Sequence, residues 1–487
     1  MYNARLKLGP VQKPLNPSNP LLLGAGVQPV SGLDGQYNAD GTPNETARDR
    51  TRLARPTIIR MGGTSMDTYD WRAGVGSERG YIANYLIAGD QQIAYAGTDE
   101  LLDLCADVYA IPLLTISPYL PLTSSLEWIQ YALDRYRGAR RIRGPLIVVG
   151  GNEPYLDANA WNSDYDMTSE EFAAWAVGFV SAVRAAYSED DVRIGIPTRS
   201  DFIGGLPAVH KIGHQDALFA AFHAADWVPD FFAIHNAYLP DISGPGVPGD
   251  VAWVASQVSH LTFDADMQQM RDKISEFYPG LSAVEFGATE YAGFAQGIPG
   301  FSATAAAACY EASVLMEMVR QRVELATRWS LSGNGDFGVV QRWGTKRLGQ
   351  YVFEVCREWM SDSPGTYVTS AAMLTCPTLE LDAPCYRAPA GAPVTRVGHM
   401  EMLTDAAGGG TSRTLMVNRD ATAPCALSFR SAAQMRRARL RTARANGGAL
   451  DPNATPVLEH SLPTLADPRE GSCVLPPASV SLLTLEY

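Results

Sequence analysis

Short apolar runs alternate with helical patterns over the first 350 residues of the chain. Runs that are apolar at nearly every position are typical of strands in a parallel sheet that is covered on both faces. Strands of this kind with helices between them predict a (β/α)8 barrel, an α/β fold. A doubly wound open sheet is the alternative, although no G-x-G-x-x-G motif follows the first strand. The predicted strands are Pro20–Gly24, Thr57–Met61, Ile111–Ile116, Pro145–Val149, Val192–Ile196, Phe231–Ile234, Ala283–Phe286 and Leu325–Leu331.

Helix starts lie between these strands. Thr98-Asp99-Glu100 begins one helix, because acidic residues in the first turn interact favourably with the helix dipole. Ser124–Glu127 and Thr168–Glu171 match the capping-box pattern, in which the first and last residues cap each other's backbone amides. After the second box, one apolar stripe at helical spacing is expected to face the sheet: Phe172, Trp175, Phe179 and Val183.

Beyond Gly365 the pattern changes to short alternating segments, such as Ser412–Val417 and Val474–Leu485. This pattern predicts an antiparallel β-sandwich. Tyr2–Leu8 alternates in the same way, so we expect it to add a strand to this second domain. Ala432–Arg444 is basic and poorly patterned for a strand. The expected domains are a barrel over residues 17–350 and a C-terminal sandwich over residues 363–487 that includes residues 1–16.

The composition disfavours two classes of partner. With 39 Lys and Arg against 52 Asp and Glu, the chain has a formal net charge of −13, which opposes binding to nucleic acid. The short basic clusters Arg137–Arg143 and Arg436–Arg441 contain no aromatic residues, and we interpret them as solvated faces. No stretch approaches the ~18 consecutive apolar residues of a membrane helix, and no secretory signal is visible. We therefore expect no membrane contact and a cytoplasmic location.

Cysteine and histidine spacing indicates no metal site. Seven cysteines without C-x-x-C spacing argue against a zinc site and a disulfide framework, although Cys376 and Cys385 are close enough in sequence to pair. His210 and His214 have the i, i+4 spacing of a helical metal site. No acidic partner motif accompanies them, so we interpret both as structural and expect neither metal nor cofactor.

Two glutamates come at the ends of apolar strands. Glu153 follows the fourth strand in a Gly-Asn-Glu-Pro segment, and Glu290 follows the seventh in a Gly-Ala-Thr-Glu segment. Barrel active sites lie at the C-terminal ends of the strands. Glycoside hydrolysis requires two facing carboxylates, because one protonates the leaving oxygen while the other attacks or activates water. The pair therefore predicts a glycosidase.

These motifs resemble those of clan A retaining glycoside hydrolases, in which Asn-Glu-Pro closes strand four and a Glu closes strand seven. Within that clan, the first two-thirds of the chain is similar to family 51, the α-L-arabinofuranosidases. Arg60–Gly63 and Tyr69–Gly76 resemble its Arg-x-Pro-Gly-Gly and Tyr-x-Trp-x-x-Gly-x-Gly segments, and Gly97–Leu101 resembles its Gly-Thr-Asp-Glu-Phe helix start. Tyr351–Glu354, leading into a sandwich, also fits that family's layout.

Two positions depart from the family 51 pattern. Thr64 stands where that family usually has an Asn that touches the sugar, and Gln28 aligns best with a Glu near the end of the first strand. Gly62-Gly63-Thr64 with Asp67, together with the segment around Glu153, also resembles family 79, the β-glucuronidases and heparanases. Both families imply the same class of reaction on different sugars, so an arabinofuranosidase, a β-glucuronidase and another clan A β-glycosidase all remain open.

The resemblance implies roles for further side chains. His235 and Tyr238 follow the sixth strand, where clan A enzymes orient the nucleophile and contact substrate; a core His and a packing Tyr are the alternative. Trp329 would form a floor for the sugar ring or pack inside the barrel, and Arg60 would hold the nucleophile ionised or form a structural ion pair. The implied substrate-binding residues are Asn152, Gln28, Arg60, Asp67, Trp71, His235, Tyr238 and Trp329.

The sequence therefore predicts a retaining, exo-acting glycoside hydrolase whose partner is an oligosaccharide or glycoside, with the oligomeric state left open. Glu153 is the expected acid/base, its pKa raised by a semi-buried position, and Glu290 is the expected nucleophile. Asn152 is expected to bind the sugar 2-hydroxyl. The alternatives are a carbohydrate-binding barrel, which has no need of two glutamates, and a metal-dependent hydrolase. The metal-dependent enzyme requires a His/Asp cluster at strand ends, where only His235 is placed.

Overall fold

The computed structural model describes most of the barrel and of the C-terminal region. The described residues are 1–8, 16–17, 20–84, 90–139, 144–156, 167–199, 211, 213–235, 237–238, 263, 267–278, 285–293, 300–333, 338–341, 347–361, 366–367, 372–376, 378–380, 396–398, 400–405, 410–451 and 453–487.

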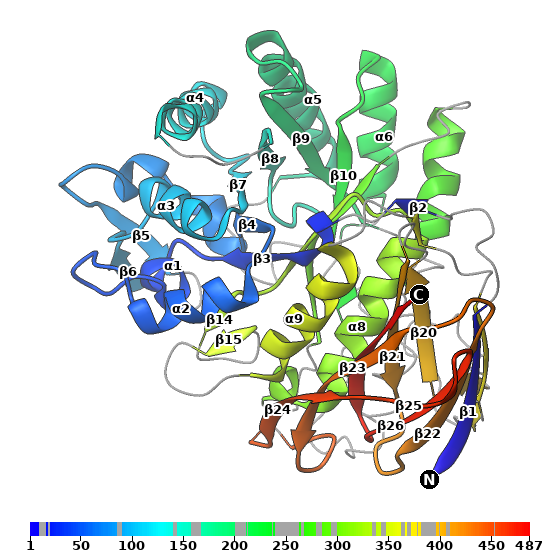
Figure 1. Ribbon diagram of the computed structural model, residues 1–487. Helices are drawn as coiled ribbons and strands as arrows, with labels where there is room; N and C mark the ends of the chain where they lie inside the picture. The colour runs from blue at the N-terminus through cyan, green and yellow to red at the C-terminus, as the bar shows by residue number, and fades with distance from the viewer. Residues whose placement is uncertain are drawn as a thin grey trace.

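Parallel strands close into a barrel (Figure 1). Each strand pairs in parallel with the next one along the chain, and the last pairs with the first, which closes the ring. The predicted (β/α)8 fold is thereby confirmed. The strands are β3 (Gly24–Val27), β4 (Ile58–Met61), β7 (Ile111–Ile116), β8 (Leu146–Gly150), β9 (Val192–Pro197), β10 (Phe231–Ile234), β12 (Phe286–Ala292) and β13 (Leu325–Arg328).

Helices follow the strands on the outside of the ring (Figure 1). They are α2 (Glu45–Ala54), α3 (Thr98–Val108), α4 (Leu122–Ala139), α5 (Ser169–Ala186), α6 (His214–Ala225), α8 (Ala305–Arg320) and α9 (Leu348–Ser361). Shorter elements in the loops are η1 (Pro20–Leu23), α1 (Ser31–Gly35), η2 (Thr64–Thr68), η3 (Trp71–Gly74), β5 (Tyr81–Asn84), β6 (Asp90–Ile93), β11 (Ala237–Tyr238), η7 (Phe301–Ala303), β14 (Ser332–Gly333) and β15 (Val340–Gln341).

One of the two predicted capping boxes is present. At the start of α5, the Thr168 hydroxyl accepts a hydrogen bond from the Glu171 amide at 3.1 Å, and the Glu171 carboxylate accepts one from the Thr168 amide at 2.8 Å. The box expected at Ser124–Glu127 is wrong, because α4 begins two residues earlier, at Leu122. The Ser124 amide instead donates to the carbonyl of Pro121, inside the first turn.

Two barrel strands begin later than their apolar runs. Pro20–Leu23 forms a 3-10 helix, and the first strand is the glycine-rich β3. A Cβ at Gly24 would lie 2.5 Å from the Ala326 carbonyl oxygen, so only glycine fits at this position of the strand. An apolar run of larger residues is therefore not found where the strand lies. The seventh strand, β12, starts where the predicted run Ala283–Phe286 ends. Glu290 therefore lies inside its strand, whereas part of the predicted run falls outside the described residues.

The C-terminal region forms two packed sheets. Their orders are β17-β1-β22-β26-β25 and β2-β16-β20-β21-β27-β23-β24, and apolar side chains such as Leu427, Phe429, Leu440 and Leu483 share one core. This is the predicted C-terminal β-sheet domain. Its strands are β1 (Tyr2–Leu8), β2 (Asn16–Pro17), β16 (Thr366–Tyr367), β17 (Ala372–Thr375), β20 (Met400–Asp405), β21 (Thr411–Asn418), β22 (Cys425–Ser431), β23 (Arg437–Asn446), β24 (Thr455–Ser461), β25 (Thr464–Asp467), β26 (Glu470–Leu475) and β27 (Ser479–Glu486), and beside them β18 (Thr378–Glu380) pairs with β19 (Arg396–Gly398).

The expectation for Ala432–Arg444 is wrong, because most of this segment lies in β23, between β27 and β24. Its alternation depends on Ala438 and Leu440, which are buried, while the neighbouring Arg437 and Arg439 are exposed. Arg441 forms ion pairs with two glutamates of α9, at 3.0 and 2.8 Å. Arginines thus conceal the strand pattern, because they add charge without entering the core.

Two barrel helices attach this region to the barrel. Both α8 and α9 pack against the seven-stranded sheet, and Arg320 at the end of α8 forms an ion pair with Glu401 of β20 at 2.7 Å. None of the helices that the structure describes combines the length and the apolar character needed to span a membrane. The domain limits at residues 17–350 and 363–487 remain a prediction.

The N-terminal strand β1 lies inside the five-stranded sheet, beside strands from the other end of the chain (Figure 1). It pairs in parallel with β22 and antiparallel with β17, and it buries Ala4, Leu6 and Leu8. Deleting residues 1–8 is expected to destabilise the domain by roughly 5 kcal/mol, because three apolar side chains and both ladders are lost. Thermal unfolding measures the effect. Lys7→Ala, at an exposed position of the same strand, is the control, and an unchanged midpoint for the deletion would contradict the expectation.

Candidate active site

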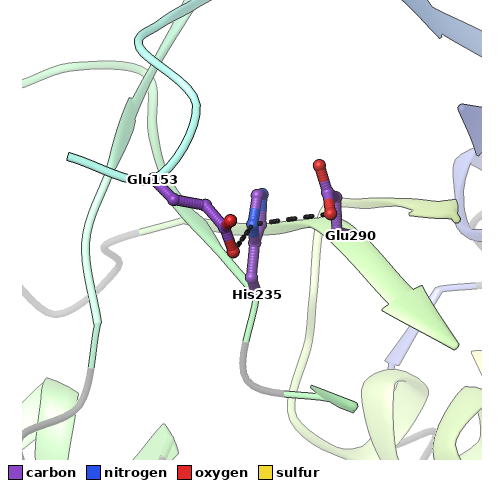
Figure 2. Close-up of side chains that lie close together, drawn as sticks. All are labelled: Glu153, His235 and Glu290. Carbon is purple, nitrogen blue, oxygen red and sulfur yellow. Dashed lines mark hydrogen bonds and ion pairs between the residues drawn. The ribbon is translucent and has the colours of Figure 1, made fainter. Parts of the chain in front are cut away.

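Three ionisable side chains meet at the C-terminal ends of the barrel strands (Figure 2). Glu153 follows β8, His235 follows β10 and Glu290 lies within β12. One oxygen of each carboxylate and one ring nitrogen of His235 lie within 4.8 Å of one another. The imidazole lies between the two carboxylates in Figure 2. The barrel thus brings together two glutamates that are 137 positions apart in the chain.

Arg60, on β4, is the partner of Glu290. Its guanidinium donates to Oε1 of Glu290, to the side-chain oxygen of Asn152 at 2.8 Å and to the hydroxyl of Thr115 at 3.1 Å. The Arg60 side chain is completely buried, and 6 % of the Glu290 side chain is exposed. Charge-assisted hydrogen bonds of this kind are strong and directional, so Arg60 holds the Glu290 carboxylate in one orientation and ties it to Asn152.

The two glycines that follow β4 make room for Arg60 and for Trp329. A Cβ at Gly62 would lie 2.3 Å from the guanidinium carbon of Arg60, and a Cβ at Gly63, where φ is +86°, would lie 2.6 Å from the Trp329 ring. The guanidinium lies 5.9 Å from the centroid of that ring. The Arg-x-Gly-Gly segment therefore allows the Trp329 ring to lie beside the buried arginine that bonds Glu290.

Glu153 is held by His235. Nδ1 of His235 lies 2.9 Å from Oε1 of Glu153, Nε2 lies 3.0 Å from the Thr289 hydroxyl, and the Tyr155 hydroxyl donates to Oε1 at 3.3 Å. Burial raises the pKa of Glu153, but the hydrogen bond and charge of His235 outweigh it, so the pKa lies below its usual value. The raised pKa of Glu153 that was expected from the sequence is therefore wrong, because that expectation considered burial but not the hydrogen bond from His235.

Two further polar side chains lie near the site: Asp67 is close enough to interact electrostatically with both glutamates, and Gln28 lies near Gly63 beside the Trp329 ring. Burial and then the charge of Glu153 raise the pKa of Asp67 to about 8. Asp67 is therefore largely protonated at neutral pH. Gln28 follows β3 and lies near Gly63, and its side-chain oxygen has no hydrogen-bond partner among the described residues. A buried amide oxygen without a partner is a candidate for a contact with a ligand hydroxyl.

Asp67→Asn is expected to stabilise the protein at pH 7 by up to about 4 kcal/mol. The folded pKa of about 8 exceeds the usual value of 3.8, so folding takes up a proton between these pH values and stability falls as pH rises through that range. Asparagine has no proton to gain, so the advantage should vanish at pH 4. Urea unfolding at both pH values measures the difference, and equal effects at pH 4 and pH 7 would contradict it.

The other sequence-predicted residues lie in different surroundings. Trp71 packs against Tyr131 of α4, with ring centroids 5.0 Å apart, so its ring contact is with a barrel helix. Tyr238 is in β11, which pairs with the end of β12. His214 is the first residue of α6, and burial lowers its pKa to about 4, whereas His210 lies outside the described residues. Cys376 is a free thiol, and Cys385 also falls outside the described part.

A buried ion pair that the sequence analysis did not identify stands behind this site. Arg328 of β13 and Glu311 of α8 are both fully buried and lie 2.7 Å apart. Glu311 also accepts from the Gly293 amide at the end of β12, while Arg328 donates to the carbonyls of Trp329 and Ser330. The pair thus joins the strand of Glu290 to that of Trp329. The sequence signal that could have identified this ion pair is Arg328, a charged residue within a predicted apolar strand.

No family model matches the chain, and no curated protein sequence matches it. Solved structures do match over the whole length of both chains. A GH51 arabinofuranosidase from Xanthomonas axonopodis pv. citri is 15% identical with a TM-score of 0.75, and a family 51 α-L-arabinofuranosidase from Bifidobacterium longum is 17% identical with a TM-score of 0.76. A family 44 xyloglucanase from Paenibacillus polymyxa is 11% identical with a TM-score of 0.62. At these identities the likeness shows that the fold is shared.

Proposed function

We propose that the protein is a retaining glycoside hydrolase with Glu290 as the nucleophile and Glu153 as the acid/base. The observation that carries the proposal is the pair of carboxylates at the barrel mouth, with one oxygen of each within 4.8 Å of the other. Retaining enzymes hold the two carboxyl groups roughly 5–5.5 Å apart, and inverting enzymes hold them ~6.5–9.5 Å apart to admit a water molecule. The short separation supports direct attack by a carboxylate.

The surroundings of the two glutamates support this division of roles. Arg60 fixes Oε1 of Glu290, and its charge favours a carboxylate that attacks the anomeric carbon. The Glu153 side chain is 24% exposed, which gives it access to the leaving oxygen and later to water. To act as the acid, Glu153 must be protonated in one step and ionised in the next. His235 can face both forms, because the Thr289 hydroxyl both donates and accepts and so accommodates either tautomer of His235.

We further propose an exo-acting enzyme of the α-L-arabinofuranosidase kind. The family 51 neighbours share the fold over the full chain. Three observations support a sugar subsite beside Glu290: Asn152 and Trp329 both contact Arg60, the partner of Glu290, and the side-chain oxygen of Gln28 has no hydrogen-bond partner among the described residues. A β-glucuronidase is the second candidate, because Thr64 and Asp67 follow the glycine pair as in family 79. The uncommon feature of this site is the protonated Asp67, a group able to donate a hydrogen bond to a sugar oxygen.

Aryl glycosides test both levels of the proposal. The panel contains 4-nitrophenyl glycosides of arabinofuranose, glucuronic acid, xylose and galactofuranose. Turnover of any one, with the first-formed product in the configuration of the substrate by NMR, supports the retaining hydrolase. Preference for arabinofuranose supports the finer proposal. First-formed product of inverted configuration rejects the assigned mechanism, and binding of sugars without turnover of any glycoside favours a carbohydrate-binding barrel.

A further inference from the structure

We propose that Glu153, His235 and Glu290 form a binding site for a single Zn²⁺ ion that blocks the active site. The three side chains come from the ends of three different barrel strands and point toward one another (Figure 2). Binding of the ion is a property of these side chains alone. The consequence for turnover rests on the proposed function, since the ion occupies both groups that the reaction needs.

The distances are close to those of a tetrahedral zinc site. Zinc bonds of ~2.0–2.2 Å to nitrogen and oxygen place two ligand atoms roughly 3.3–3.5 Å apart. Nδ1 of His235 lies 2.9 Å from Oε1 of Glu153 and 3.8 Å from Oε2 of Glu290, which brackets that value. The two carboxylate oxygens are within 4.8 Å, so they must approach each other by little more than 1 Å. The fourth position is left for water, because Glu153 is partly exposed.

The environment of His235 suits a metal ligand. Metal-binding histidines use their second ring nitrogen to donate to an oxygen acceptor, which fixes the tautomer and the ring orientation. Nε2 of His235 lies 3.0 Å from the Thr289 hydroxyl, so the Nε2–H tautomer is available and leaves Nδ1 with a lone pair toward both glutamates. The hydroxyl of Thr289 therefore serves as a positioning group for the metal form of His235.

The charges around the cluster limit the affinity and select the ion. Arg60 donates to Oε1 of Glu290, so the other oxygen, Oε2, is the one that faces His235. The positive charge of Arg60 weakens cation binding without occupying that oxygen. An imidazole ligand favours zinc over magnesium, which prefers oxygen ligands and retains its water. We therefore expect a reversible zinc site that magnesium does not fill.

Isothermal titration of the full-length protein with zinc chloride at pH 7.0, in a weakly coordinating buffer, tests the site directly. The expected result is one Zn²⁺ per chain, with no heat from magnesium chloride. His235→Ala is expected to weaken zinc binding by roughly 100-fold or more, because the only nitrogen ligand is lost. His460→Ala is the matched control, since His460 is an exposed histidine within β24 of the C-terminal sheet, and it should leave the affinity unchanged.

Glu153→Gln provides a second variant in case His235→Ala does not fold, and it is also expected to weaken binding because an amide oxygen is a poorer zinc ligand. Unchanged affinity in a folded His235→Ala or Glu153→Gln protein, an equal loss in His460→Ala, or equal binding of magnesium would overturn the site. Zinc should also inhibit aryl glycoside turnover in competition with substrate. Zinc binding without any glycosidase activity would reject the proposed function while leaving the metal site intact.

Discussion

Replacing Glu290 with alanine is expected to lower kcat on every glycoside by about four orders of magnitude or more. Among the described residues, no other carboxylate is placed to attack the anomeric carbon, since Glu153 lies on the opposite side of His235 and Asp67 is largely protonated at neutral pH. Good and poor leaving groups should suffer alike, because the bond to the nucleophile is needed for both. Steady-state kinetics with two aryl glycosides that differ in leaving-group pKa measure the loss.

This substitution also leaves Arg60 completely buried without its carboxylate partner. Removing one member of a buried ion pair costs about 3–5 kcal/mol, so unfolding must be measured beside activity. Glu290→Gln keeps an acceptor for the guanidinium and should be inactive yet more stable than the alanine variant. Glu285→Ala is the matched control, because Glu285 lies just before β12, pairs with Arg193 and has a half-exposed side chain. A folded Glu290→Ala protein near the wild-type rate would end the glycosidase proposal.

The barrel could be predicted from the sequence because its strands are buried on both faces. β7 and β10 are apolar at nearly every position, so their limits follow from composition alone. The first strand could not be placed in the same way. In β3, close contact with β13 requires glycine at Gly24, and close contact with the Trp329 ring requires glycine at Gly26. A strand built from small residues gives a weak apolar signal. The stronger run beside it, Pro20–Leu23, forms a 3-10 helix.

The part of the candidate site that could be predicted from the sequence is the pair of glutamates at strand ends. Glu153 and Glu290 are recognisable because a carboxylate after an apolar run is unusual and two of them suggest shared chemistry. Their partners depend on three-dimensional packing. The resemblance implied that Arg60 holds Glu290 ionised, but nothing in the sequence indicates that Arg60 also bonds Asn152, or that His235 lowers the pKa of Glu153. These interactions depend on side chains from strands far apart in sequence, so spacing along the chain does not contain them.

Replacing Glu153 with alanine is expected to have an effect that depends on the leaving group. The loss removes the proton donor, so glycosides with poorly acidic leaving alcohols should lose roughly 10²–10⁴-fold in kcat/KM. The phenolate of an activated aryl glycoside leaves without needing a proton, so such a substrate should still glycosylate Glu290. Deglycosylation then becomes slow, because no base activates the water, and the covalent intermediate should accumulate. A pre-steady-state burst of the released phenol detects that accumulation.

Azide separates this variant from the Glu290 variant by the product that each forms. In Glu153→Ala, azide attacks the glycosyl enzyme without needing a base, restores turnover of the activated substrate and gives a glycosyl azide of retained configuration. In Glu290→Ala, azide has to replace the nucleophile itself, so any azide product has inverted configuration. Tyr155→Phe is the control for the surroundings of Glu153, since it removes only the hydroxyl that donates to Oε1. Equal losses on activated and unactivated glycosides, with no rescue by azide in Glu153→Ala, would show that the two glutamates do not divide the reaction between attack and proton transfer.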